Sequence, residues 1–85
     1  MELIDRKMLI KLSMKRLAEQ ARSIEKDIAR DIEFIEAKTE LLPNQSLAID
    51  IEKMIAERMN RVDNLRVSLQ MIALMQELLV KETRS

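Results

Sequence analysis

The chain of 85 residues contains no cysteine, histidine, glycine, tryptophan or tyrosine, and its only aromatic side chain is Phe34. The absence of cysteine and histidine excludes thiol nucleophiles, thiolate and imidazole metal ligands, and the most common general base. The absence of glycine excludes the glycine-rich loops that bind phosphate groups. The composition therefore predicts that the protein is not an enzyme and that it holds no metal and no cofactor.

Glu33, Glu36 and Glu40 lie close to one face of an expected helix, as the ligands of a carboxylate metal site would. Di-iron helical bundles place carboxylates in this way, but they also use Glu-x-x-His pairs. Since the chain has no histidine, a solvated acidic face is the better interpretation.

Long hydrophobic runs are also absent. The longest uncharged run, residues 67–76, is about half of the roughly 20 residues that span a bilayer. The first residues, MELIDRKMLIKLSMKR, carry a charge every few positions, which is not typical of a secretory signal. We therefore expect a soluble, cytoplasmic protein.

Proline occurs once, at Pro43, in the sequence LLPNQS of residues 41–46. It has no amide donor and disfavours helical angles at Leu42, while Asn44 and Ser46 are good N-cap residues for a following helix. We expect one domain, residues 1–85, with a first helix of about residues 2–41, a turn at 42–46 and a second helix of about 47–82. The predicted fold is all-α, an antiparallel two-helix hairpin of the coiled-coil type. A single long helix kinked at Pro43 is the alternative.

Apolar residues recur in both segments at the spacing of a coiled-coil seam. A hairpin bent at Pro43 pairs residues whose numbers add to about 89, such as Leu17 with Ile72 and Ile24 with Leu65. Ile35 then meets Met54 or Ile55. The expected seam comprises Leu3, Ile10, Met14, Leu17, Ala21, Ile24, Ile28, Ile35 and Leu42, followed by Ile51, Ile55, Val62, Leu65, Leu69, Ile72 and Leu79.

Two polar residues, Asp31 and Arg58, interrupt the two halves of the seam at matching positions. We expect them to face each other and to fix the register of the helices, as a partly exposed ion pair or as a buried one. Lys7 and Glu82 form a second match, near the chain termini.

A second apolar stripe lies on the side of the second helix away from the seam, and further apolar residues occupy the outer side of the first helix near its start. Closer to the turn, the outward positions are polar. A helix that is apolar most of the way round is normally buried, and a two-helix hairpin cannot cover this surface alone. We therefore expect self-association or a partner helix to complete a three- or four-helix bundle. The predicted partner-binding residues are Met8, Leu9, Leu12, Val67, Met71, Leu74, Met75 and Leu78.

Charge is unevenly distributed although the net charge is zero. Residues 6–22 carry six basic side chains against one acid, Glu19, and have a net charge of +5. We expect this stretch to attract an acidic partner. Its candidate contact residues are Lys7, Lys11, Lys15 and Arg22. Nucleic acid is a weaker candidate, because side chains that stack on bases are lacking.

These patterns favour a non-enzymatic protein-interaction module, an adaptor or chaperone whose apolar end binds a partner helix. In size, hairpin form and apolar end, the predicted architecture is similar to that of the small helical-hairpin chaperones of bacterial type III secretion. The resemblance is one of shape and implies a partner helix, without indicating which residues bind it. The alternative is a homodimeric four-helix bundle with a regulatory role, such as RNA binding through the basic face of the first helix. In shape, this bundle resembles the plasmid-encoded Rop protein.

Overall fold

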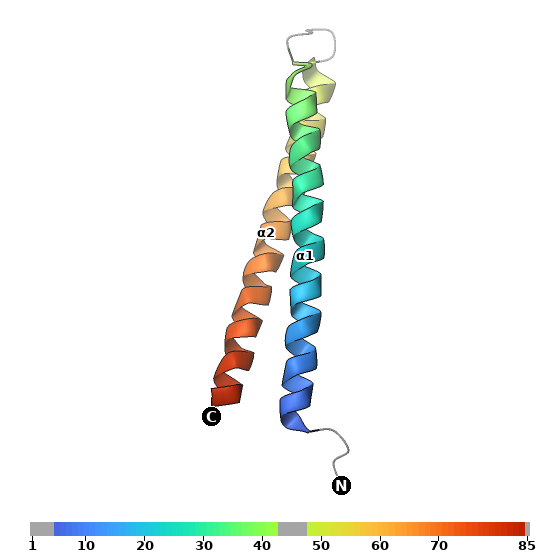
Figure 1. Ribbon diagram of the computed structural model, residues 1–85. Coiled ribbons are helices and arrows are strands. Elements are labelled where there is room, and N and C mark those ends of the chain that lie inside the picture. Colours follow the sequence, from blue (N-terminus) through green and yellow to red (C-terminus); the bar gives the residue numbers. More distant parts are fainter. Residues whose placement is uncertain (1–4, 43–47, 85) are drawn as a thin grey trace.

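The computed structural model describes residues 5–42 and 48–84, which form two helices packed against each other. Helix α1 spans Arg6–Thr39 and helix α2 spans Ala48–Arg84. The helices run antiparallel as a rod of 68 × 18 × 17 Å, with the end of α1 at Thr39 and the start of α2 at Ala48 at one end, and Arg6 and Arg84 at the other (Figure 1). The predicted all-α hairpin is confirmed. The alternative of one kinked helix is wrong, because α1 and α2 contact each other.

The ends of α1 follow from its sequence. Asp5 is the N-cap residue, and its carboxylate accepts a hydrogen bond from the backbone N–H of Lys7 at 3.2 Å, which satisfies one of the free donors of the first turn. At the other end, the N–H of Leu41 donates to the carbonyl of Lys38 and that of Leu42 to Thr39, so that the helix closes in tight turns. Pro43, Asn44 and Ser46, on which the predicted turn rests, lie outside the described residues.

The interface between α1 and α2, hereafter the seam, is a ladder of buried and half-buried residues in alternating steps of three and four, as in a coiled coil. All of the expected apolar residues lie in it except Leu3, which is outside the described residues, and Ile55 is more buried than Met54. Two half-buried polar residues, Lys38 and Gln76, continue the ladder at positions that the sequence analysis left out. The ladder of α1 is Ile10, Met14, Leu17, Ala21, Ile24, Ile28, Asp31, Ile35 and Lys38, continued by Leu42 after the helix, and that of α2 is Ala48, Ile51, Ile55, Arg58, Val62, Leu65, Leu69, Ile72, Gln76 and Leu79.

The core of a single hairpin is small. In the part of the chain that the structure describes, the only side chains classed as buried are Asp31, Ile51, Val62 and Ile72. In α1 the apolar residues gather on one side, whereas in α2 they are distributed almost evenly around the axis. One neighbouring helix therefore covers most of the apolar side of α1. It leaves many of the apolar side chains of α2 in contact with water.

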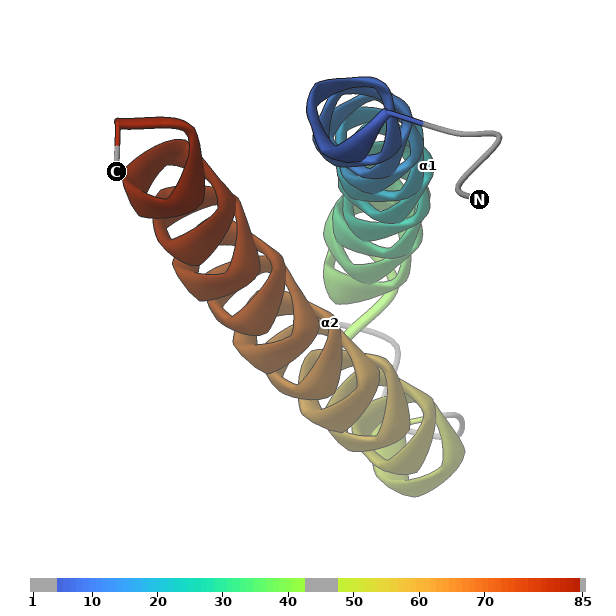
Figure 2. The same cartoon turned by 90° about the horizontal axis from the view of Figure 1, so that it is seen from below.

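The helices are inclined to each other, as a view along the rod shows (Figure 2). In this view and in Figure 1, the end of α1 near Arg6 and the end of α2 near Arg84 stand apart. This part of the rod, which holds residues 6–20 and 67–84, is called the open end below.

Candidate protein-docking surface

The polar centre of the seam joins Asp31 of α1 to Arg58 of α2. Nη1 of Arg58 donates a hydrogen bond to Oδ1 of Asp31 at 2.9 Å. The Asp31 side chain is 2% exposed, while that of Arg58 is 38% exposed. The structure thus brings together the two residues expected to set the register, and it buries the carboxylate while leaving the guanidinium partly in water.

A second arginine, Arg61, also approaches the buried carboxylate. Its Nε lies 3.1 Å from Oδ2 of Asp31, within ion-pair distance. The N–H direction does not meet the requirements of a hydrogen bond, however, and Oδ2 lacks a hydrogen-bond partner among the described residues. We therefore assign the structural role to Arg58, which is aligned, and a weaker electrostatic contribution to Arg61, which is half exposed.

Phe34 extends this cluster in a way that the sequence analysis missed. The guanidinium carbon of Arg58 lies 4.2 Å from the centre of its ring, and Nζ of Lys38 lies 5.4 Å from it. Both distances suit cation–π attraction. The ring therefore holds the Arg58 guanidinium in the orientation in which it donates to Asp31. The sequence offered a signal for this contact, because Phe34 is the only aromatic residue of the chain and lies about one helical turn after Asp31.

All eight predicted partner-binding residues are exposed, between 43% and 62%. They come from both helices of the open end: Met8, Leu9 and Leu12 from α1, and Val67, Met71, Leu74, Met75 and Leu78 from α2. Exposed single apolar residues are common on protein surfaces. A group of this size on one end of a small protein is instead typical of an interaction site.

Two grooves run along the open end between the helices. The first, with a volume of about 500 Å³, joins Leu17 of α1 to Met75, Leu78 and Leu79 of α2, with Arg16 at its edge. The second, of about 340 Å³, shares Leu79 with the first and is otherwise lined by Ile10, Met14 and Val80 together with Lys7, Lys11 and Thr83. Both grooves are lined mainly by apolar side chains, with Arg16 beside the first and Lys7 and Lys11 beside the second. This lining suits a helix that is apolar on one side and acidic on the other.

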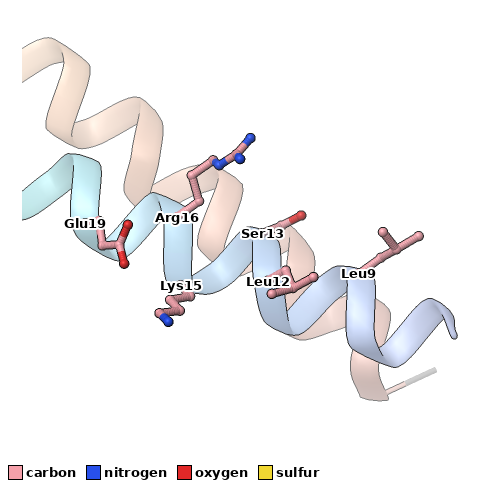
Figure 3. A pocket seen from close by; sticks show the side chains of 6 residues that line it. All are labelled: Leu9, Leu12, Ser13, Lys15, Arg16 and Glu19. Carbon is pink, nitrogen blue, oxygen red and sulfur yellow. The ribbon is translucent and has the colours of Figure 1, made fainter. Parts of the chain in front are cut away.

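A third hollow, of about 420 Å³, lies on α1 alone, and its six lining side chains all project from that helix (Figure 3). It contains Leu9 and Leu12 with Lys15, Arg16 and Glu19. Since Arg16 also lines the first groove, the two form a continuous surface. Along the three hollows the lining residues include four basic side chains, Lys7, Lys11, Lys15 and Arg16, and one acid, Glu19.

The basic residues proposed for electrostatic contact, Lys7, Lys11, Lys15 and Arg22, are all exposed. At the termini, Arg6, the neighbour of Lys7, contacts the carboxylate of Glu82. This contact joins the two helices one residue away from the match predicted for Lys7 and Glu82.

Comparison with known proteins gives no relative. No protein-family model matches the chain, and neither curated proteins nor solved structures show a match. Within residues 5–42 and 48–84, neither helix has a stretch long and apolar enough to cross a membrane. Over the same residues, no three acidic side chains are grouped in a way that suits a metal ion, and this includes Glu33, Glu36 and Glu40. A functional interpretation must therefore rest on the surface of the hairpin.

Proposed function

We propose that this protein is a non-enzymatic interaction module, an adaptor or chaperone that binds an amphipathic helix of another chain at its open end. The main support is the exposure of all eight apolar residues of that end, beside two grooves lined mainly by apolar side chains. A helix laid in such a groove covers apolar side chains at intervals of three and four residues. It would thereby complete the bundle that the two helices begin.

The partner helix should carry acidic residues along the edges of its apolar face. Four basic side chains border the three hollows and only one acidic side chain does. Charges at the edge of an interface contribute mainly to the association rate and to specificity. Binding should therefore weaken at high ionic strength, and the loss should appear mostly in the association rate.

Co-purification from the native cells tests this proposal, with Met75→Glu compared to Met59→Glu. Met75 lines a groove of the open end, whereas Met59 is similarly exposed but lies closer to the turn. A defined partner that is lost with Met75→Glu and kept with Met59→Glu, and that forms a stoichiometric complex from purified components, supports the proposal. Recovery of the same proteins by both variants contradicts it.

A second candidate function is a homodimeric four-helix bundle that binds RNA through α1. The observation that favours it is the exposure of Lys7, Lys11 and Lys15 on one helix. Phosphate contacts of this kind weaken steeply with added salt. If RNA is the ligand, Lys11→Glu with Lys15→Glu should abolish retention of RNA on the protein in a filter-binding assay, and unchanged retention excludes this function.

A further inference from the structure

The outer side of α2 at the open end carries an apolar stripe that neither groove explains. It consists of Val67, Met71, Leu74 and Leu78, each more than half exposed, and is called the outer stripe below. Its residues lie two positions after those of the seam, so the stripe faces away from α1. A helix bound in a groove between α1 and α2 would cover Leu78 at its edge and leave the other three side chains in water.

We propose that the outer stripe is covered by the same stripe of a second copy of this chain, in antiparallel orientation, with a twofold axis between residues 72 and 73. This inference goes beyond the proposed function, since it assigns an occupant to a surface that a helix bound in the grooves leaves exposed. The spacing of the stripe reads the same in both directions, as steps of four, three and four. An antiparallel copy therefore sets Met71 against Leu74 and Val67 against Leu78, each pairing occurring twice.

The charges beside the stripe favour this orientation. In an antiparallel pair, the residues just before Met71 and Leu78, together with those seven positions further out along the helix, form one edge of the contact and face the same edge of the partner. Asp63 then faces Arg84 of the second copy, and Gln70 faces Glu77. Both Asp63 and Arg84 are exposed in the hairpin. The symmetry forms the Asp63–Arg84 pair twice, at the two ends of the overlap.

The other edge of the stripe agrees. There, Arg61 faces Glu82 of the second copy. Both residues already contact a side chain of their own chain, Asp31 and Arg6 respectively, and both remain about half exposed. A carboxylate accepts hydrogen bonds from more than one guanidinium group, so the additional contact is compatible with the existing ones.

A parallel pairing of the stripe is disfavoured by the same residues. In parallel coiled coils, the residue just before Met71 or Leu78 would face the residue of the partner helix whose number is five higher. This arrangement would place Glu77 against Glu82 twice, with like charges at close range. The charge pattern thus distinguishes the two orientations, while the apolar spacing fits both.

The overlap has limited length, and α1 lies outside it. From Arg61 to Arg84 the paired helices would run for about 36 Å at 1.5 Å per residue. A contact of this length, with four half-exposed apolar residues from each copy, belongs with the smaller protein interfaces, so dimerisation should depend on protein concentration. Met8 and Leu12 of α1 remain open in the dimer, as do the basic residues beside them. A foreign helix can therefore bind the same molecule.

Cysteine cross-linking tests the orientation directly, because the natural chain has no cysteine. Chains with Met71→Cys are mixed with chains carrying Leu74→Cys and oxidised at concentrations from about 1 µM to about 1 mM, a range that covers weak dimers. The antiparallel register brings the two different positions together at disulfide distance and keeps like positions apart. We expect the mixed product in several-fold excess over its statistical proportion. A mixture of Met59→Cys and Leu74→Cys chains is the control and should not exceed that proportion.

Three results would overturn the inference. Excess of the like-with-like products would show a parallel dimer, equal yield in the control mixture would show random collision, and a monomeric mass by sedimentation equilibrium over the whole range would exclude the dimer. These failures are separate from failure of the proposed function. A monomer that binds an acidic helix through Met75 rejects only the dimer, whereas a cross-linked dimer without a foreign partner rejects only the adaptor role.

Discussion

Removal of Arg58 is expected to destabilise the hairpin more than removal of any other exposed or half-exposed charged residue. Its guanidinium donates to Oδ1 of Asp31 at 2.9 Å, and the carboxylate is only 2% exposed. Truncating one partner of a buried ion pair typically costs about 3–5 kcal/mol, because the other charge stays buried without compensation. Since Arg58 is itself 38% exposed, we expect Arg58→Leu to lower the free energy of unfolding by about 2–4 kcal/mol.

A double-mutant cycle isolates the pair from the stacking on Phe34. Arg58→Leu removes the contact with the Phe34 ring both in the wild type and in Asp31→Leu. The free energy of that contact therefore cancels when the effects of Arg58→Leu in the two backgrounds are subtracted. Replacing both members of a buried pair by apolar residues is often neutral or stabilising. We therefore expect the double variant to be more stable than Arg58→Leu alone. Arg61→Leu is the matched control and should cost below about 1 kcal/mol, because Arg61 is half exposed and not aligned for a hydrogen bond.

Urea unfolding followed by circular dichroism measures these differences, at one fixed protein concentration because association adds to stability. Equal losses for Arg58→Leu and Arg61→Leu would refute the reasoning. So would a double variant less stable than Arg58→Leu, since Asp31 would then stabilise the hairpin without its partner.

Further predictions concern the core, the helix start and the aromatic ring. Ile72→Ala should lower the free energy of unfolding by about 2–5 kcal/mol, because this side chain is one of the few that are buried. Ile49 is 82% exposed, so Ile49→Ala should change that free energy by less than about 0.5 kcal/mol. Urea unfolding distinguishes the two variants. Asp5→Ala removes the side-chain acceptor at the N-cap of α1 and should cost about 1 kcal/mol, seen as faster hydrogen exchange in the first turn; unchanged exchange there would reject the cap. Phe34→Leu removes the ring beside Arg58 and should cost about 1 kcal/mol in the wild type but less in Arg58→Leu, and equal losses in both backgrounds would show that the ring acts by packing alone.

The fold was readable from the sequence because it depends on local chemistry and regular spacing. The alternation of three and four places the seam, and the position of Pro43 sets Asp31 and Arg58 opposite each other, which predicts their contact. The exposure of the eight residues at the open end also agrees with their helical positions. Which molecule covers them is not encoded in the geometry of one chain, so that part of the prediction stays a proposal.

Other features depended on side-chain directions that spacing alone does not give. Arg61 reaches Asp31 from one turn beyond Arg58, and Phe34 stacks on Arg58, because long side chains extend past their own positions on the helix. Glu82 contacts Arg6 and not the predicted Lys7. The pairing is displaced by one residue, which is common near the end of a helix. Lys38 and Gln76 occupy seam positions that an apolar pattern does not reveal, because both side chains are polar.

The central claim is that another helix covers the apolar surface of the open end. Solvent exposure of the methionine methyl groups, measured by NMR with a soluble paramagnetic agent at high protein concentration, tests it most directly. Met71 and Met59 are almost equally exposed in the hairpin, at 58% and 54%, but only Met71 belongs to the open end. The account predicts that the Met71 methyl group is protected and that of Met59 is not. Equal exposure of both methyl groups, in a protein that remains monomeric and folded and that binds no partner from its native cells, would contradict it.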